Sequence, residues 1–177
     1  MYPTAIFRIL KRNLDLVEQA LVLTLYAWLV SRLWPDQISS TNWYSLLILV
    51  SEGLVVVLLV TRRRTDLIST NFRDWAVAFS GTFFVLLVET GGPPLSATGG
   101  ALLLLFGLAI HVAAKLSLLR SFGLVAADRG VKRGGLYAVV RHPMYAGYML
   151  THIGFLVASP SWWNLAVYGA EWALFIA

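Results

Sequence analysis

Apolar residues gather into six long runs along the chain, separated by short polar or basic stretches. The runs cover residues 14–34, 43–61, 74–90, 97–119, 143–159 and 161–177. Each has about 17 to 23 residues, which as an α-helix is long enough to cross roughly 30 Å of hydrocarbon. The pattern predicts an all-α fold, a polytopic membrane helix bundle with about six transmembrane segments.

Basic residues lie on alternate connections between these runs. Of the fourteen Lys and Arg residues, only Arg32 falls on the other side of the bundle. The positive-inside rule therefore places the N-terminus in the cytoplasm, and leaves short outer turns that include residues 35–42 and 90–94. We expect a single membrane domain over residues 1–177. Its parts are a four-helix region at 1–119, a cytoplasmic loop at 120–142 and a helical hairpin at 143–177.

Composition supports a membrane protein. The chain is 58% hydrophobic and 13% charged, whereas a soluble domain carries about 25% charged residues. It has no cysteine, which excludes disulfides, zinc–thiolate sites and a cysteine nucleophile. The net charge of +5 indicates loops near anionic lipid rather than binding to nucleic acid. The short outer turns are typical of a bacterial inner-membrane protein.

The segment Arg141-His142-Pro143-Met144-Tyr145-Ala146-Gly147 opens the fifth run. Pro143 has no N–H and suits the first helical position, and it disfavours a helical backbone at His142. The free N–H groups of the first turn and the helix dipole favour a carboxylate or phosphate there. Arg141 adds a cation that can bind such an anion in a bidentate manner. The sequence predicts an anion-binding corner at the membrane surface.

Two faces follow along this helix. One carries small residues and is typical of close helix packing: Gly147, Thr151, Gly154 and Ala158. The other carries aromatic and polar residues at helical spacing: Tyr145, Tyr148, Met149 and His152. Polar groups at membrane depth need partners or water. The second face therefore either lines a site or makes structural hydrogen bonds.

Further polar residues lie inside the apolar runs. Glu52 either lines a tunnel for the substrate or hydrogen-bonds to a neighbouring helix as a neutral acid. His111 lies one turn before Lys115 and within expected reach of Glu52 or His152. We expect Glu52, His111, Tyr148 and His152 to line the substrate. Their spacing does not require a metal, so we predict none.

Residues Gly134–Gly147 and the upstream Leu119–Gly123 resemble the isoprenylcysteine carboxyl methyltransferase family, which groups with the phospholipid methyltransferases of membranes. The similarity covers roughly residues 105–170. It implies S-adenosylmethionine bound at the cytoplasmic face, and methyl transfer to a lipid-borne or apolar acceptor such as the carboxylate of a prenylated cysteine. It implies catalytic roles for Arg141 and Tyr145. It also implies a cofactor-binding set: Tyr137, His142, Pro143, Tyr145 and Gly147.

The chain also departs from that family. Leu136 stands where the family often has proline. The acidic pair and arginine that complete the family's cofactor pocket have no match before Ala177, and no arginine follows Glu171. A non-catalytic or truncated family member acting as a membrane scaffold is therefore one alternative. A nicotinamide-dependent membrane sterol or enone reductase is another, although such proteins usually carry an acidic residue at the position of Tyr148.

Overall fold

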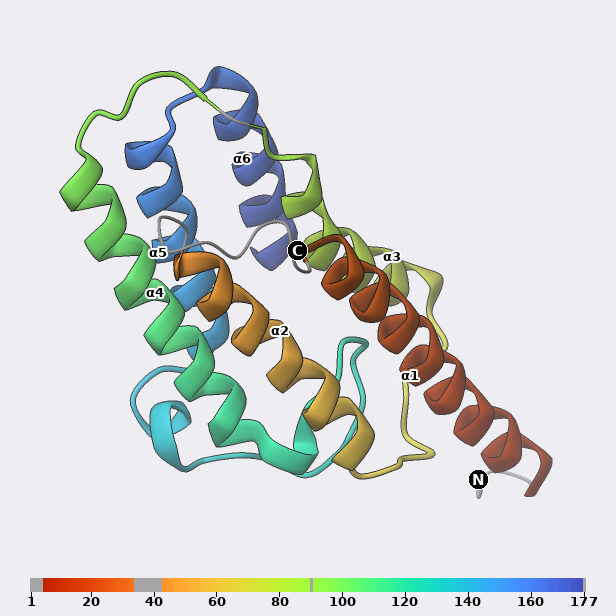
Figure 1. Ribbon diagram of the computed structural model, residues 1–177. Coiled ribbons are helices and arrows are strands. Elements are labelled where there is room, and N and C mark those ends of the chain that lie inside the picture. The colour runs from red at the N-terminus through yellow and green to blue at the C-terminus, as the bar shows by residue number, and fades with distance from the viewer. Residues whose placement is uncertain (1–4, 34–42, 90, 177) are drawn as a thin grey trace. The chain divides into compact units, whose positions relative to one another are not determined.

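The computed structural model describes residues 5–33, 43–89 and 91–176 (Figure 1). These form six α-helices: α1 (Ala5–Leu33), α2 (Trp43–Thr61), α3 (Phe72–Phe83), α4 (Ala97–Leu118), α5 (Pro143–Ala158) and α6 (Trp162–Ile176). Three short 3₁₀ turns accompany them: η1 (Phe84–Leu87), η2 (Leu119–Ser121) and η3 (Gly135–Ala138). The all-α prediction is confirmed for the described residues.

Each of the six predicted runs overlaps one α-helix. The first helix begins at Ala5, nine residues before its predicted run, and the third ends seven residues before its run does. The α-helix α3 begins where the Asn71 side chain accepts a hydrogen bond from the Arg73 N–H at 3.0 Å. It ends at Phe83 and continues as the 3₁₀ turn η1, whereas the apolar run predicted a helix to residue 90. Residues 82–85 are aromatic or β-branched, which lose side-chain freedom in an α-helix.

One helix in the described part of the chain, Ala97–Ser121, is long and apolar enough to cross a membrane, and Val50–Thr61 is a shorter apolar helix. The other predicted spans and the cytoplasmic N-terminus stay predictions. Residue 34, the outer turn at 35–42, Thr90 and Ala177 lie outside the described residues.

Contacts within the chain gather into two compact units. Unit 1 comprises Met1–Thr70 and Leu118–Lys132, and unit 2 comprises Asn71–Ser117 and Arg133–Ala177. In unit 1, the segment after α2 runs beside the loop 118–132. The Ser69 N–H donates to the Ala126 carbonyl, and the Asp128 N–H donates to the Leu67 carbonyl, both at 2.9 Å. This pairing holds the loop against the N-terminal helices.

In unit 2, α4 and α5 approach so closely that their glycines have no room for a side chain. A Cβ added at Gly107 would lie 2.6 Å from the Thr151 nitrogen, and one at Gly154 would lie 2.6 Å from the Leu104 nitrogen. Gly100 meets Ala158 in the same way. The small-residue face predicted from the sequence is therefore confirmed as the α4–α5 packing surface.

Three residues separate α5, which ends at Ala158, from α6, which begins at Trp162. The start of α6 is fixed to the segment after α3. The Glu89 N–H donates to Asn164 Oδ1 at 3.0 Å, and Asn164 Nδ2 donates to the Glu89 carbonyl at 2.8 Å. Trp163 Nε1 donates to the Leu87 carbonyl at 2.8 Å. These bonds set the register of α6 against the segment that follows α3.

Candidate functional site

The start of α5 has the geometry that the sequence predicts. Pro143 is the first helical residue and is buried, while His142 precedes it with φ −131° and ψ 64°, outside the helical region. The Ala146 N–H closes the first turn on the His142 carbonyl at 3.2 Å, and no side chain caps this end of the helix. The remaining N–H groups of the turn, beside the exposed Arg141, can bind an anion.

A row of stacked aromatic rings extends from this corner. The rings of His142 and Tyr145 lie 5.6 Å apart at 17°, and those of Tyr145 and Phe175 lie 4.6 Å apart at 3°. Tyr145 remains 39% exposed, so a ligand can reach its ring. Phe175 belongs to α6, so the hairpin brings an unpredicted residue to the motif.

The η3 turn brings Tyr137 beside the same corner. Gly135 adopts a positive φ of 61°, and a Cβ there would collide with the Ser117 hydroxyl. This position of the Gly-Gly pair therefore requires glycine. Burial, and then the nearby Tyr145, raise the pKa of Tyr137 to about 12. Its hydroxyl consequently stays protonated at neutral pH and can donate a hydrogen bond.

The polar face of α5 meets polar residues of α4 and α6. The rings of His111 and Tyr148 lie 4.0 Å apart, and those of Tyr148 and His152 lie 6.2 Å apart. Trp172 Nε1 donates to His152 Nδ1 at 3.1 Å, and His152 Nε2 lies 3.9 Å from Glu171 Oε2. Three of the four predicted substrate-lining residues are thus brought together in unit 2.

The fourth predicted substrate-lining residue, Glu52, belongs to unit 1. Its side chain accepts a hydrogen bond from Tyr26 of α1, which fits the interpretation that Glu52 bonds to a neighbouring helix. No group of three or more His, Cys, Asp or Glu among the residues that the structure describes is placed to hold a metal ion.

Comparison with known families bears on the interpretation of the motif. Residues 95–177 match the family model described as phospholipid methyltransferase. This part of the chain, just under half of it, is therefore similar to that family, whose members are membrane-associated methyltransferases that act on lipid-type substrates. No curated protein and no solved structure matches the chain. The matched residues contain α4, α5 and α6 and all of the motif residues discussed above.

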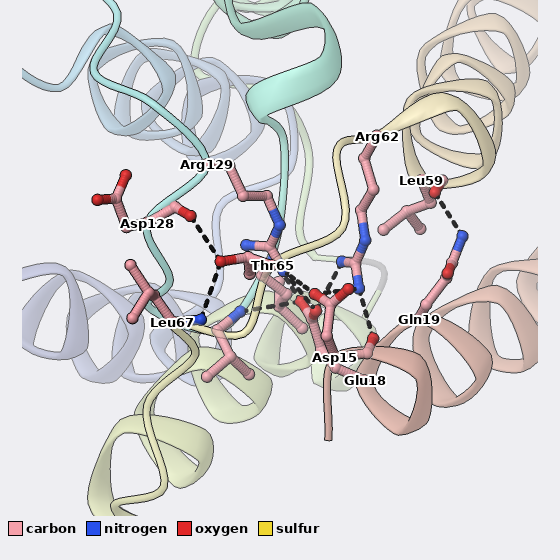
Figure 2. Close-up of polar contacts among 11 residues, drawn as sticks. Asp15, Glu18, Gln19, Leu59, Arg62, Thr65, Leu67, Asp128 and Arg129 are labelled. Carbon is pink, nitrogen blue, oxygen red and sulfur yellow. Dashed lines mark hydrogen bonds and ion pairs between the residues drawn. The ribbon is translucent and has the colours of Figure 1, made fainter. Parts of the chain in front are cut away.

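Four buried charged side chains hold the loop 118–132 to the N-terminal helices within unit 1 (Figure 2). Asp15 and Glu18 of α1, Arg62 at the end of α2 and Arg129 of the loop are all buried. Arg129 Nη2 donates to Asp15 Oδ1 at 2.6 Å and to Glu18 Oε2 at 3.0 Å. Arg62 Nη2 donates to Asp15 Oδ1 at 3.0 Å, and its Nη1 lies 2.6 Å from Glu18 Oε2. We call these four residues the charge cluster.

Glu18 also binds the backbone of the loop. Its Oε1 accepts hydrogen bonds from the N–H groups of Leu124 and Val125 at 2.8 and 3.1 Å. The loop is therefore an ordered element of unit 1 rather than a flexible linker. Sequence reasoning did not find this cluster, although Asp15 and Glu18 share a helix face at i and i+3.

The three arginines at 62–64 do not share one environment. Arg63 and Arg64 are exposed, but Arg62 is buried and bound to two carboxylates. A buried charge needs a partner more strongly than an exposed one. Arg62 meets this need with its two carboxylate partners.

Proposed function

We propose that the chain transfers a methyl group from S-adenosylmethionine to a lipid-borne acceptor at the cytoplasmic face of a bacterial inner membrane. The observation that carries the proposal is the uncapped helix start at Pro143, beside Arg141 and a stacked His142–Tyr145 pair, within a phospholipid methyltransferase domain. Such a corner offers hydrogen-bond donors and positive charge to an anion and aromatic faces to a cation.

The residues present fit the two ends of this cofactor. The N–H groups of the first turn and the Arg141 guanidinium suit its carboxylate. The exposed face of Tyr145 suits its sulfonium. When bound, the cofactor supplies an electrophilic methyl group. The chain's own residues then act by positioning the reactants. Pro143 fixes where the helix begins, and the neutral Tyr137 hydroxyl can donate a hydrogen bond. Holding the methyl acceptor and the methyl donor together can supply much of the rate acceleration.

The acceptor is lipid-borne in this proposal, in keeping with the substrates of the family. His111, Tyr148 and His152 of unit 2 are the residues proposed to line it. The six-span bundle with a cytoplasmic N-terminus would place the motif at the lipid–water boundary, where such an acceptor is available.

A substitution at Arg141 tests the proposal. Arg141→Leu is expected to lower methyl incorporation into lipid about 10- to 100-fold, since a hydrogen bond to a charged group contributes about 1.5–3 kcal/mol. The measurement is transfer of labelled methyl from S-adenosylmethionine into liposome lipids by the purified protein. Arg133→Leu, also at an exposed position, should retain activity. Absence of transfer by the native chain would favour the scaffold alternative.

A further inference from the structure

In unit 1, the ends of two apolar helices are joined by hydrogen bonds. The helix α2 ends at Thr61, and the helix Ala97–Ser121, which is long and apolar enough to cross a membrane, has residues 118–121 in this unit. The Arg63 N–H donates to the Arg120 carbonyl at 2.7 Å, and Arg120 Nε donates to the Thr61 carbonyl at 3.1 Å. Because a membrane helix ends where the chain leaves the hydrocarbon, we expect this junction at the level of the lipid headgroups.

Three exposed arginines gather at this junction: Arg63, Arg64 and Arg120. A Cβ added at Gly130 would lie 3.7 Å from Arg63 Nη1, so the Arg63 guanidinium lies against the loop. The charge of Arg62 is compensated within the charge cluster, whereas none of these three arginines has an ion-pair partner among the residues that the structure describes. Their charges are therefore available to a partner outside the chain.

The backbone that carries these arginines is fixed in place. Figure 2 shows Thr65 between the two paired segments, where its Oγ1 donates to the Asp128 carbonyl at 2.8 Å and accepts from the Leu67 N–H at 3.0 Å. Ile68 pairs with Ala127 in an antiparallel bridge and is 1% exposed. Since the segments are already ordered, less conformational entropy is lost when the arginines bind a partner.

Exposed apolar side chains accompany the arginines. Leu119 is 52% exposed and immediately precedes Arg120, and Val131 is 81% exposed and immediately follows Gly130. Leu67, in the segment after α2, is 55% exposed. Arginines interspersed with exposed apolar side chains are typical of a surface at the lipid–water boundary, where cations meet phosphates and apolar groups meet acyl chains. The apolar side chains therefore favour a lipid over an acidic protein as the partner.

Two exposed carboxylates oppose this positive charge. Asp128 Oδ1 accepts a hydrogen bond from the Gly130 N–H at 2.9 Å, so its carboxylate is held in a local turn. Asp66 lies two residues after Arg64 and is exposed. Outside the charge cluster, segments 61–70 and 118–132 carry four basic and two acidic residues. The surface therefore remains positive, and Asp66 is expected to weaken its attraction for an anion.

We propose that Arg63, Arg64 and Arg120 form a binding site for the headgroup phosphate of an anionic phospholipid at the edge of the bilayer. An arginine fork can bind two phosphate oxygens at once, and the neighbouring Leu119 and Val131 contact the lipid's apolar part. A zwitterionic lipid binds less well because its own ammonium group neutralises the phosphate. The site belongs to unit 1, whereas the cofactor corner belongs to unit 2, and the inference does not depend on methyl transfer.

The test measures binding of short-chain lipids to the purified full chain in an uncharged detergent, by calorimetry. Dihexanoyl phosphatidylglycerol should bind at least tenfold more tightly than dihexanoyl phosphatidylcholine, since each basic residue near an anionic lipid surface favours binding about fivefold. Raising the salt concentration from about 0.01 M to about 1 M should weaken binding of the anionic lipid, because salt screens exposed charges. Equal binding of the two lipids, or binding that salt does not change, would overturn the proposal.

Variants distinguish a site from attraction by net charge. Arg63→Leu with Arg64→Leu should weaken binding of phosphatidylglycerol at least tenfold, since two such residues are lost. Arg63→Lys with Arg64→Lys, which keeps the charge, should change it only a few-fold. The matched control, Arg73→Leu with Arg133→Leu, removes two exposed arginines of unit 2 and should leave binding unchanged. An equal loss in this control would overturn the site.

Two further arms test the sign of the charge and the nature of the ligand. Asp66→Asn removes an opposing carboxylate and should tighten binding of phosphatidylglycerol about two- to fivefold, and unchanged or weaker binding would contradict the site. Inorganic phosphate at the concentration of the lipid should not displace it, because phosphate makes no contact with the exposed apolar side chains. Displacement by phosphate would indicate a site for free anions and overturn the assignment to lipid.

Discussion

Replacing Arg129 by leucine is expected to lower the free energy of unfolding by about 3–5 kcal/mol, the range for breaking a buried ion pair. Arg129 binds both Asp15 and Glu18 in the buried charge cluster. Its loss leaves two carboxylates facing Arg62 alone, so one negative charge remains buried without compensation. Denaturant unfolding of the purified protein in mild detergent measures the change. Arg64→Leu, at an exposed position, should change stability by no more than about 0.5 kcal/mol.

A second variant separates charge imbalance from lost packing. Asp15 and Arg129 form a close ion pair at 2.6 Å. Removing both, as Asp15→Leu with Arg129→Leu, restores neutrality to the cluster. The double variant should then be less destabilised than the sum of the two single ones. Simple additivity would show that the two charges do not interact in the folded protein.

Gly147→Ala is expected to destabilise unit 2 by about 2–3 kcal/mol, in the upper range for overpacking. A Cβ at this position would lie 2.7 Å from the His111 nitrogen and 2.9 Å from the Gly107 carbonyl oxygen. Both neighbours are backbone atoms of α4, so the helices would have to separate. The family resemblance placed Gly147 in the cofactor pocket, and its observed neighbours give it a packing role between α4 and α5.

Gly169→Ala provides the matched control for this prediction. Gly169 lies in α6, and nothing lies within 4 Å of a Cβ added there. Because alanine favours a helix over glycine by roughly 0.5–1 kcal/mol, this variant should be neutral or slightly more stable. The same unfolding measurement serves both variants. Equal stability of the two would contradict the close α4–α5 contact.

Local rules predicted the parts of the structure that depend on neighbouring residues. Pro143 could be placed at a helix start, and Gly147 and Gly154 on a packing face, because both depend on positions a few residues apart. The end of α3 was missed because helix propensity, and not hydrophobicity, limits the helix at Phe83. The outline of the anion-binding corner was therefore predicted from one short segment.

Those local rules could not predict contacts between segments that lie far apart in the sequence. The charge cluster joins Asp15 to Arg129 across 114 positions, and nothing in the spacing of charged residues specifies that pairing. The same holds for the partners of His152. The polar face of α5 was predicted from the sequence. The contacts of His152 with Glu171 and Trp172, however, depend on the register of α6, which is set by bonds such as that of Asn164 to Glu89.

Binding of S-adenosylhomocysteine to the purified protein, measured by calorimetry for the native chain and for His142→Ala, tests the central claim most directly. His142 stacks on Tyr145 at the uncapped start of α5. Saturable binding by the native chain, weakened at least tenfold in the variant, is the predicted result. Absence of binding to the native chain, or equal binding to both proteins, would contradict a cofactor site at this helix start.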